Sequence, residues 1–324
     1  MHINSFHMRA TASGDIARLF GSSNNDASKS DEMSKSHGHR HGMPDRAGSS
    51  RAMREAVNTI FDVLTSQNPN GMTAVTATRG DHTFTAVKGS GGADTISYAN
   101  SDTSRVVSAY IDAGGGDDVI SFASTSEGSN RIYGGDGNDA IGAAAPRIRT
   151  VDGGAGNDVI SVAGERIGSV RGGSGDDTIA VAGKSVSRVS GGDGNDMISV
   201  TGSRVGRIYG GDGDDTIAVT ADRAGWISGG AGNDNINLNG EGLVAFKAGD
   251  GQDMVTIADR TEFAIFGESW GDDVMTLDKA NFTFENGALT VSFDGRDETI
   301  TILSGGGDMK LEMTSDRTFV VTPG

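Results

Sequence analysis

The sequence predicts an all-β protein: a parallel β-roll or β-solenoid of about 19-residue coils, with a short N-terminal helix and a β-rich C-terminal cap. Two observations predict this fold. Turns rich in glycine and aspartate recur along the middle of the chain, and each leads directly into alternating apolar residues. The turns then keep a constant spacing of 19 residues over seven copies. That spacing is too short for a βα unit with room to spare, but it closes one flattened coil of two short strands.

The composition agrees with a repeat architecture and limits the partners. Of 324 residues, 51 are glycine and only 35% are apolar, which is too little for one large globular core. The net charge of −17 argues against nucleic acid and against an anionic membrane surface, and it favours cations. No run of 18 apolar residues is present, so we expect no membrane span. Without cysteine, the chain has no disulfides.

The N-terminal quarter is expected to hold a tail and a cap. Residues 1–50 are polar and contain histidine, and we expect them to be disordered. His37, His39 and His41 could bind a transition metal, although a solvated segment is the favoured interpretation. Residues 51–88 are expected to form an N-terminal cap, with an amphipathic helix over 51–66 and strands over 72–88.

The repeats occupy residues 89–276 and predict the solenoid. Each unit has two short extended segments and two turns, with apolar residues at fixed offsets that should stack into buried columns. One column holds valines 162, 181, 200 and 219, and Ser, Thr or Ala should face outward beside it. The glycine-aspartate turns start at Gly89, Ala113, Gly134, Gly153, Gly172, Gly191, Gly210, Gly229, Ala248 and, in a degraded copy, Glu268.

Residues 277–324 are expected to form a β-rich C-terminal cap and tail. The segment 281–303 has the pattern of a strand, an Asn286–Gly287 turn and two more strands. Two further strand-like stretches, KLEMTS and RTFVV, follow.

The turns match the nonapeptide G-G-x-G-x-D-x-U-x, so residues 89–276 resemble the RTX, or haemolysin-type calcium-binding, repeat family. The resemblance implies Ca²⁺ as the cofactor. It also implies an extracellular protein of a Gram-negative bacterium, exported by a type I secretion apparatus that reads an uncleaved C-terminal signal. The N-terminus lacks the apolar stretch of a cleaved signal peptide, which agrees with that route.

Calcium chemistry supports the same site. Calcium takes six to eight oxygen ligands from carboxylates and carbonyls. A column of aspartates about 4.8 Å apart would repel unless cations lay between the coils. In the family two nonapeptides make one coil, with calcium on both edges, whereas here the motif occurs once per coil. We therefore expect calcium along one edge only, in about six sites. The predicted metal-binding residues are Asp118, Gly134, Asp136, Asp139, Gly153, Asp158, Gly172, Asp177, Gly191, Asp193, Asp196, Gly210, Asp212, Asp215, Gly229, Asp234, Asp250 and Asp253.

The opposite edge is comparatively basic and is a candidate surface for anionic extracellular polysaccharide. Trp226 and Trp270 could contact a sugar, although simple packing is the favoured interpretation. The basic residues on this edge are Arg166, Lys184, Arg188, Arg204, Arg207 and Arg223.

The expected function is that of a secreted calcium-binding repeat protein that folds outside the cell and has a structural or interaction role. One alternative is a polysaccharide-binding adhesin or matrix protein. Another is a polysaccharide-modifying β-helix enzyme. The sequence contains no HExxH, no GxSxG and no cysteine nucleophile, so we expect no catalytic residues.

Overall fold

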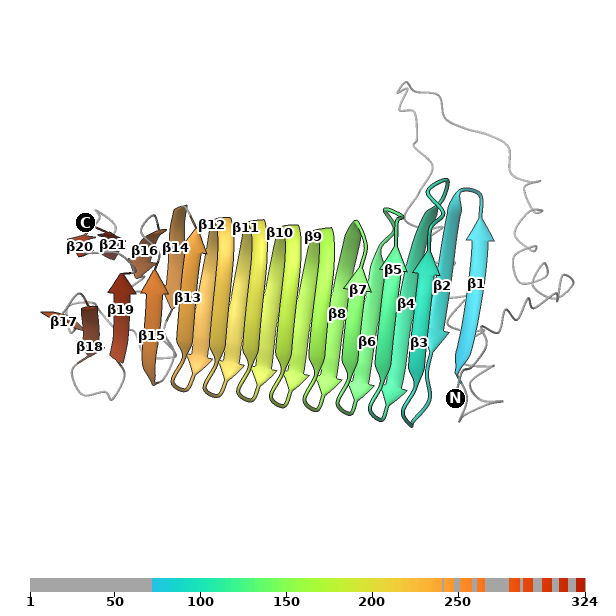
Figure 1. Ribbon diagram of the computed structural model, residues 1–324, viewed down its shortest axis with the longest axis horizontal. Helices are drawn as coiled ribbons and strands as arrows, with labels where there is room; N and C mark the ends of the chain where they lie inside the picture. Colours follow the sequence, from blue (N-terminus) through green and yellow to red (C-terminus); the bar gives the residue numbers. More distant parts are fainter. Residues whose placement is uncertain are drawn as a thin grey trace, which may run out of the picture.

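The computed structural model describes residues 72–240, 242–247, 251–257, 261–265, 280–285, 288–293, 299–304, 309–313 and 319–323. These residues form strands and turns, and they contain no helix long and apolar enough to span a membrane. The strands stack side by side along the long axis of the molecule (Figure 1). The polar segment 1–50 and the helix expected over 51–66 lie outside the described residues.

A β-hairpin lies at the N-terminal end of the stack. Strands β1 (Thr73–Arg79) and β2 (His82–Lys88) pair antiparallel, where the sequence predicts strands. Strand β2 then pairs in parallel with β4 (Val106–Gly115), so the hairpin joins the solenoid by main-chain hydrogen bonds.

The first coils consist of separate strands that alternate between two parallel sheets. Strands β3 (Thr95–Asn100), β5 (Val119–Ser124) and β7 (Ala140–Ala144) pair in one sheet. Strands β4, β6 (Asn130–Asp136) and β8 (Arg147–Ala155) pair in the other. Both sheets continue into the next coils through β9.

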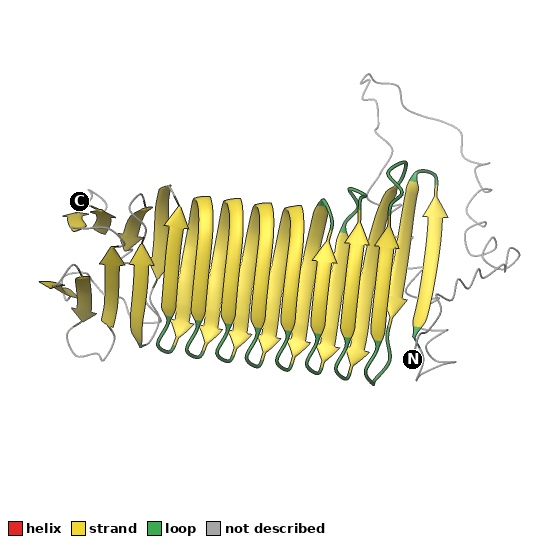
Figure 2. Cartoon of the chain, viewed as in Figure 1, coloured by secondary structure: helices red, strands yellow, loops and turns green. Residues whose placement is uncertain are grey.

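The middle coils have one loop each, not the two turns expected. Strands β9 (Val159–Ser174), β10 (Thr178–Asp193), β11 (Met197–Asp212) and β12 (Thr216–Ala231) each run for 16 residues through both sheets. Figure 2 shows loops along one edge of these coils and unbroken strand along the other. Small residues stack at the unbroken corner, where Gly183 pairs with Gly164 and Gly202, so the chain reverses there without leaving the ladder.

The core is the set of apolar columns between the two sheets. The strand after each turn alternates exposed and buried residues, as in Met197–Val200, because successive side chains point to opposite faces. Exact 19-residue register places each isoleucine over the next, as Ile198 pairs with Ile179 and Ile217. The expected valine column is buried as well, at 1–3% exposure. These columns confirm the predicted parallel β-solenoid.

The C-terminal end of the stack is less regular. Strands β13 (Asn235–Gly240) and β15 (Gln252–Ile257) continue one sheet, and β14 (Gly242–Lys247) and β16 (Thr261–Ile265) continue the other. Strand β19 (Thr299–Ser304) pairs in parallel with β15, β18 (Ala288–Phe293) pairs antiparallel with β19, and β17 (Ala280–Glu285) pairs antiparallel with β18. Strands β20 (Met309–Met313) and β21 (Phe319–Pro323) pair with each other, and β21 pairs with β16.

Candidate functional site

The loops along one edge share a single geometry, which Gly191–Asp196 illustrates. The second and fourth residues, Gly192 and Gly194, have φ values of 137° and 121°, which a residue with a side chain rarely adopts. The N–H of Gly194 donates to the carbonyl of Asp212 one coil on, at 2.7 Å. The loops are therefore bonded to one another along the edge, and only the second and fourth glycines are required for their backbone conformation.

The last residue of each loop forms a row of buried aspartates, which we call the aspartate row. In each case Oδ1 accepts a hydrogen bond from the backbone N–H of the aspartate one coil earlier; Asp177 N–H donates to Asp196 at 2.8 Å. Their side chains are only 1–2% exposed, although aspartate is rarely buried without a partner. The row comprises Asp118, Asp139, Asp158, Asp177, Asp196, Asp215, Asp234 and Asp253.

The second carboxylate oxygen is the notable atom of this edge. In the seven aspartates of the row from Asp118 to Asp234, Oδ2 is buried and accepts no hydrogen bond from any described residue. It lies against the first glycine of its own loop: a methyl group built on Gly153 would collide with Oδ2 of Asp158. The carbonyl oxygen of Gly172, one coil on, lies 2.7 Å from the same point. A carboxylate oxygen and a carbonyl oxygen of successive coils thus converge where a side chain is missing.

The same convergence repeats along the row. Gly134 faces Asp139 Oδ2 and the carbonyl of Gly153, and Gly210 faces Asp215 Oδ2 and the carbonyl of Gly229. Six successive loops have glycine at this first position, from Gly134 to Gly229. Alanine stands there in the loops on either side, at Ala113 and at Ala248.

Burial raises the pKa of these carboxyl groups. Burial is the largest cause for the seven from Asp118 to Asp234, and nearby carboxylates add to it, from the row itself at Asp177 and Asp215, whereas the main-chain N–H that binds Oδ1 lowers the pKa. The pKa rises to about 7 for Asp177 and Asp215 and to about 6 for Asp118, Asp158, Asp196 and Asp234. A rise from 3.8 to about 6 costs roughly 3 kcal/mol when the group ionises in the fold at neutral pH. The same kind of cost recurs in several coils, so the ionised carboxylates of the row oppose the fold unless a cation compensates them.

The donor set of this edge fits calcium. Hard oxygen atoms of both kinds that calcium prefers, carboxylate and carbonyl, meet in a buried space with an orphaned negative oxygen. Each coil supplies only one buried carboxylate, and accordingly the described residues contain no cluster of three or more His, Cys, Asp or Glu side chains that could hold a metal. Carbonyl oxygens would therefore have to supply most of the ligands.

The other predicted acidic ligands do not share this environment. Asp136, Asp193 and Asp212, at the third loop position, are exposed, and the carbonyl oxygen of each accepts the N–H of a glycine in the preceding coil. Their side chains lie on the surface of the loops, outside the buried aspartate row. Asp250 lies outside the described residues.

A second ladder runs along the exposed side of the loops and was not expected from the sequence. At the fifth position, the side-chain oxygen accepts the N–H of the fifth residue in the next coil, as Asn195 N–H donates to Asp176 at 2.7 Å. No two aspartates are adjacent in this ladder, so like charges are not stacked directly on each other. Its members are Asp117, Asn138, Asn157, Asp176, Asn195, Asp214, Asn233 and Gln252.

The opposite edge has a different chemistry. In the described coils no buried aspartate row occurs there, and exposed arginines stack instead, with Arg204 paired in register with Arg223. Trp226 lies half-buried in β12 and pairs in register with Arg207. Trp270 lies outside the described residues.

The first glycine of a loop gives a direct test of this geometry. We expect Gly153→Ala to destabilise the folded protein by about 3 kcal/mol or more, because the methyl group would occupy the space of Asp158 Oδ2. Gly91→Ala is the matched control, since a methyl group there has open space and its φ is not positive. Urea unfolding of both variants in calcium measures the difference. Equal stability of the two variants would contradict the packing described for Gly153.

Comparison with known proteins adds no relative. No protein-family model matches this chain, and no curated protein is similar to it.

Proposed function

We propose that this protein is a secreted calcium-binding RTX-type repeat protein with a structural or interaction role, whose solenoid forms when calcium binds along the aspartate row. The observation that carries the proposal is the buried, unsatisfied Oδ2 in seven successive coils. An orphaned buried polar atom costs stability, and a repeated one indicates a missing partner of opposite charge.

The residues that would hold the ion are those on either side of each gap between coils. In one such gap these are the carboxylate of Asp158 and the carbonyl oxygens around Gly153 and Gly172. Calcium bound there would supply the positive charge that Oδ2 lacks, and oxygen atoms of both coils would hold it. The aspartate then holds its own loop through Oδ2 and the preceding coil through Oδ1, which receives the N–H of Asp139 at 2.8 Å.

This arrangement supports a fold that depends on the calcium concentration. Where calcium is scarce, as in the cytosol, ionised carboxylates of the aspartate row oppose stacking of the coils. Where calcium is abundant, the free energy of binding becomes free energy of folding. Export in an unfolded state by a type I apparatus from a Gram-negative cell, followed by folding outside, is the biological setting that the RTX resemblance suggests.

A non-catalytic role remains a prediction. The buried carboxylates of the described coils are engaged through Oδ1 with the preceding coil, as Asp215 accepts the N–H of Asp196 at 2.8 Å. A structural role accounts for these hydrogen bonds, and no catalytic role is needed to explain them. Recognition of an anionic polysaccharide has support of its own in the arginines of the opposite edge.

Substitution of one buried carboxylate tests the proposal. We expect Asp215→Asn to lower the calcium affinity by at least about tenfold, because it removes the negative Oδ2 and leaves the Oδ1 acceptor. The same change should stabilise the calcium-free protein, since the amide N–H can donate to the carbonyl of Gly229. Isothermal titration with calcium and urea unfolding in EDTA measure the two effects.

The matched control is Asp212→Asn, in the same loop and with the same change of charge. Asp212 is exposed and lies outside the aspartate row, so the calcium affinity of the Asp212→Asn protein should stay within about threefold of the parent value. If Asp215→Asn and Asp212→Asn have the same calcium affinity, the aspartate row is not the calcium site.

A further inference from the structure

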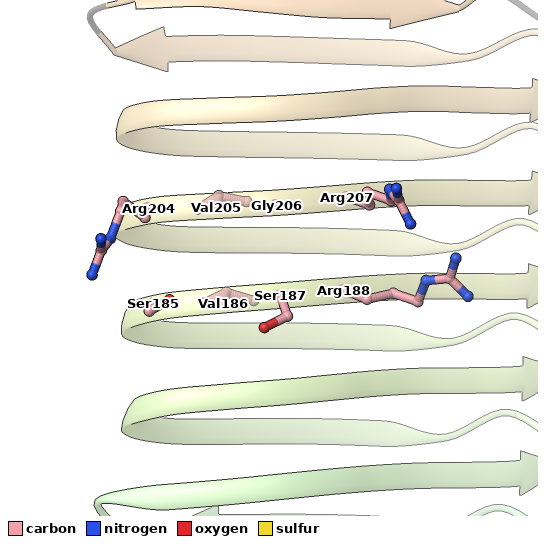
Figure 3. Close-up of a pocket in the computed structure, with 8 residues that line it drawn as sticks. All are labelled: Ser185, Val186, Ser187, Arg188, Arg204, Val205, Gly206 and Arg207. Atoms are coloured by element: carbon pink, nitrogen blue, oxygen red, sulfur yellow. The ribbon is translucent and has the colours of Figure 1, made fainter.

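An open groove lies on the sheet that follows the unbroken corner, away from the aspartate row. It encloses about 480 Å³ and is lined by residues 185–188 of β10 and 204–207 of β11. Three of its eight lining residues are arginines, namely Arg188, Arg204 and Arg207. Figure 3 shows the guanidinium groups of Arg188 and Arg207 turned toward each other from adjacent coils, while Arg204 extends from the corner.

The arginines of this groove are stacked like charges. Arg188 pairs in register with Arg207, and Arg204 pairs with Arg223 in the next coil. Directly opposed like charges destabilise a sheet. Elsewhere in the same sheet the chain stacks opposite charges, as Asp152 lies beside Arg171 at 3.5 Å. The groove thus lacks the compensation that its neighbouring coil has.

No carboxylate among the described residues pairs with an arginine of the groove, although the protein has a net charge of −17. Arg166, in the coil before, does have such a partner and contacts Glu127 at 3.2 Å. Arg188 instead lies over the ring of Tyr209, 5.2 Å from its centroid, which helps to hold its guanidinium group over the groove. An external anion is the partner that this cluster of positive charge lacks.

We propose that this groove binds a linear anionic polysaccharide that lies along the solenoid axis. Guanidinium groups recur with the coil spacing of about 4.8 Å, and their forked donors match carboxylate and sulfate groups. Ser185 and Ser187 also line the groove, and their hydroxyl groups can bond sugar hydroxyls. The lining contains no aromatic residue on which successive bases of a nucleic acid could stack.

This inference goes beyond the calcium proposal, because the groove and the aspartate row share no residue. The test uses the full-length protein in calcium, with its fold checked by circular dichroism. The probes are an oligogalacturonate for carboxylate, chondroitin sulfate for sulfate, neutral dextran, and single-stranded poly(dT). Affinity is measured by biolayer interferometry for the parent protein and for two double variants.

The groove variant is Arg188→Gln with Arg207→Gln, and the control is Arg105→Gln with Arg149→Gln. The control pair is exposed, lies outside the groove and changes the net charge equally. We expect one or both anionic glycans to bind and the groove variant to bind roughly tenfold more weakly or worse, since each charge-assisted hydrogen bond contributes about that factor. The control should stay within about twofold.

Three results would overturn the inference. They are binding of neither anionic glycan, equal loss in the groove and control variants, or binding of poly(dT) or dextran as tight as that of the anionic glycans. A groove variant that fails to fold is replaced by Arg204→Gln alone, whose side chain extends from the corner into solvent. If the parent protein is folded in EDTA and binds no calcium, the calcium proposal fails, and the same glycan measurements without calcium still test the groove.

Discussion

In EDTA at neutral pH we expect the protein to lack the β-sheet circular dichroism of the solenoid, and we expect added calcium to restore it. Seven aspartates would otherwise be buried with an ionised oxygen that no described residue binds. Ionising several buried groups at once is costly against the stability of a typical domain, about 5–15 kcal/mol. Far-ultraviolet circular dichroism during a calcium titration measures the transition, and calorimetry should count about six ions, one for each first-position glycine from Gly134 to Gly229.

Two controls separate specific binding from charge screening. Sodium chloride at the same ionic strength should not restore the fold, because screening acts weakly on buried charges. Magnesium should be much less effective than calcium, since it demands octahedral geometry and gives up water reluctantly. A protein that is fully folded in EDTA and binds no calcium would contradict the proposal outright.

Acidification should replace calcium in part. The pKa of Asp177 and of Asp215 in the fold is about 7, above the ordinary value of 3.8. Between these values the folded chain binds more protons than the unfolded chain, so stability falls as the pH rises. The calcium-free protein should therefore be most stable below about pH 4 and should lose that stability as the pH passes 6 to 7. In saturating calcium the dependence should reverse, because protons compete with the ion for the carboxylates.

Relief of net negative charge could also favour folding at low pH, and paired variants distinguish the two causes. Asp177→Asn with Asp215→Asn removes two raised carboxyl groups and should make the calcium-free protein less sensitive to pH. Asp193→Asn with Asp212→Asn removes two exposed carboxylates and an equal charge, and it should leave the pH midpoint unchanged. Urea unfolding at several pH values in EDTA provides the measurement. Equal shifts in both pairs would attribute the effect to net charge alone.

Much of the fold could be predicted because the repeat is short and strict. A spacing of 19 residues that holds register implies that residue 198 lies over 179, and both are isoleucines of the buried column. Alternation within Met197–Val200 identified the inward side chains correctly. The strands at both ends, such as β2 and β18, followed from alternation and from turn residues.

The unbroken corner at Gly183 could not be predicted from these patterns. Glycine usually indicates a turn, and the sequence therefore suggested a second loop in each coil. In the fold only a small residue fits at this corner, because a Cβ on Gly183 would lie 2.9 Å from Cδ1 of Ile167 and 3.0 Å from the carbonyl oxygen of Gly164. Those contacts join two coils, and no local propensity encodes them.

The role of each acidic residue also required the structure. The loop Gly191–Asp196 contains two aspartates that are alike in sequence, yet Asp193 is exposed and Asp196 is only 2% exposed. Only the structure shows that Arg188 and Arg207 of adjacent coils point toward each other at the groove.

Periodicity along the chain was enough to define the coil, its buried columns and the edge on which the acidic loops lie, because stacking repeats a local pattern. The direction of each charged side chain depends on the loop one coil away, and contacts of that kind exist only once the coils have stacked.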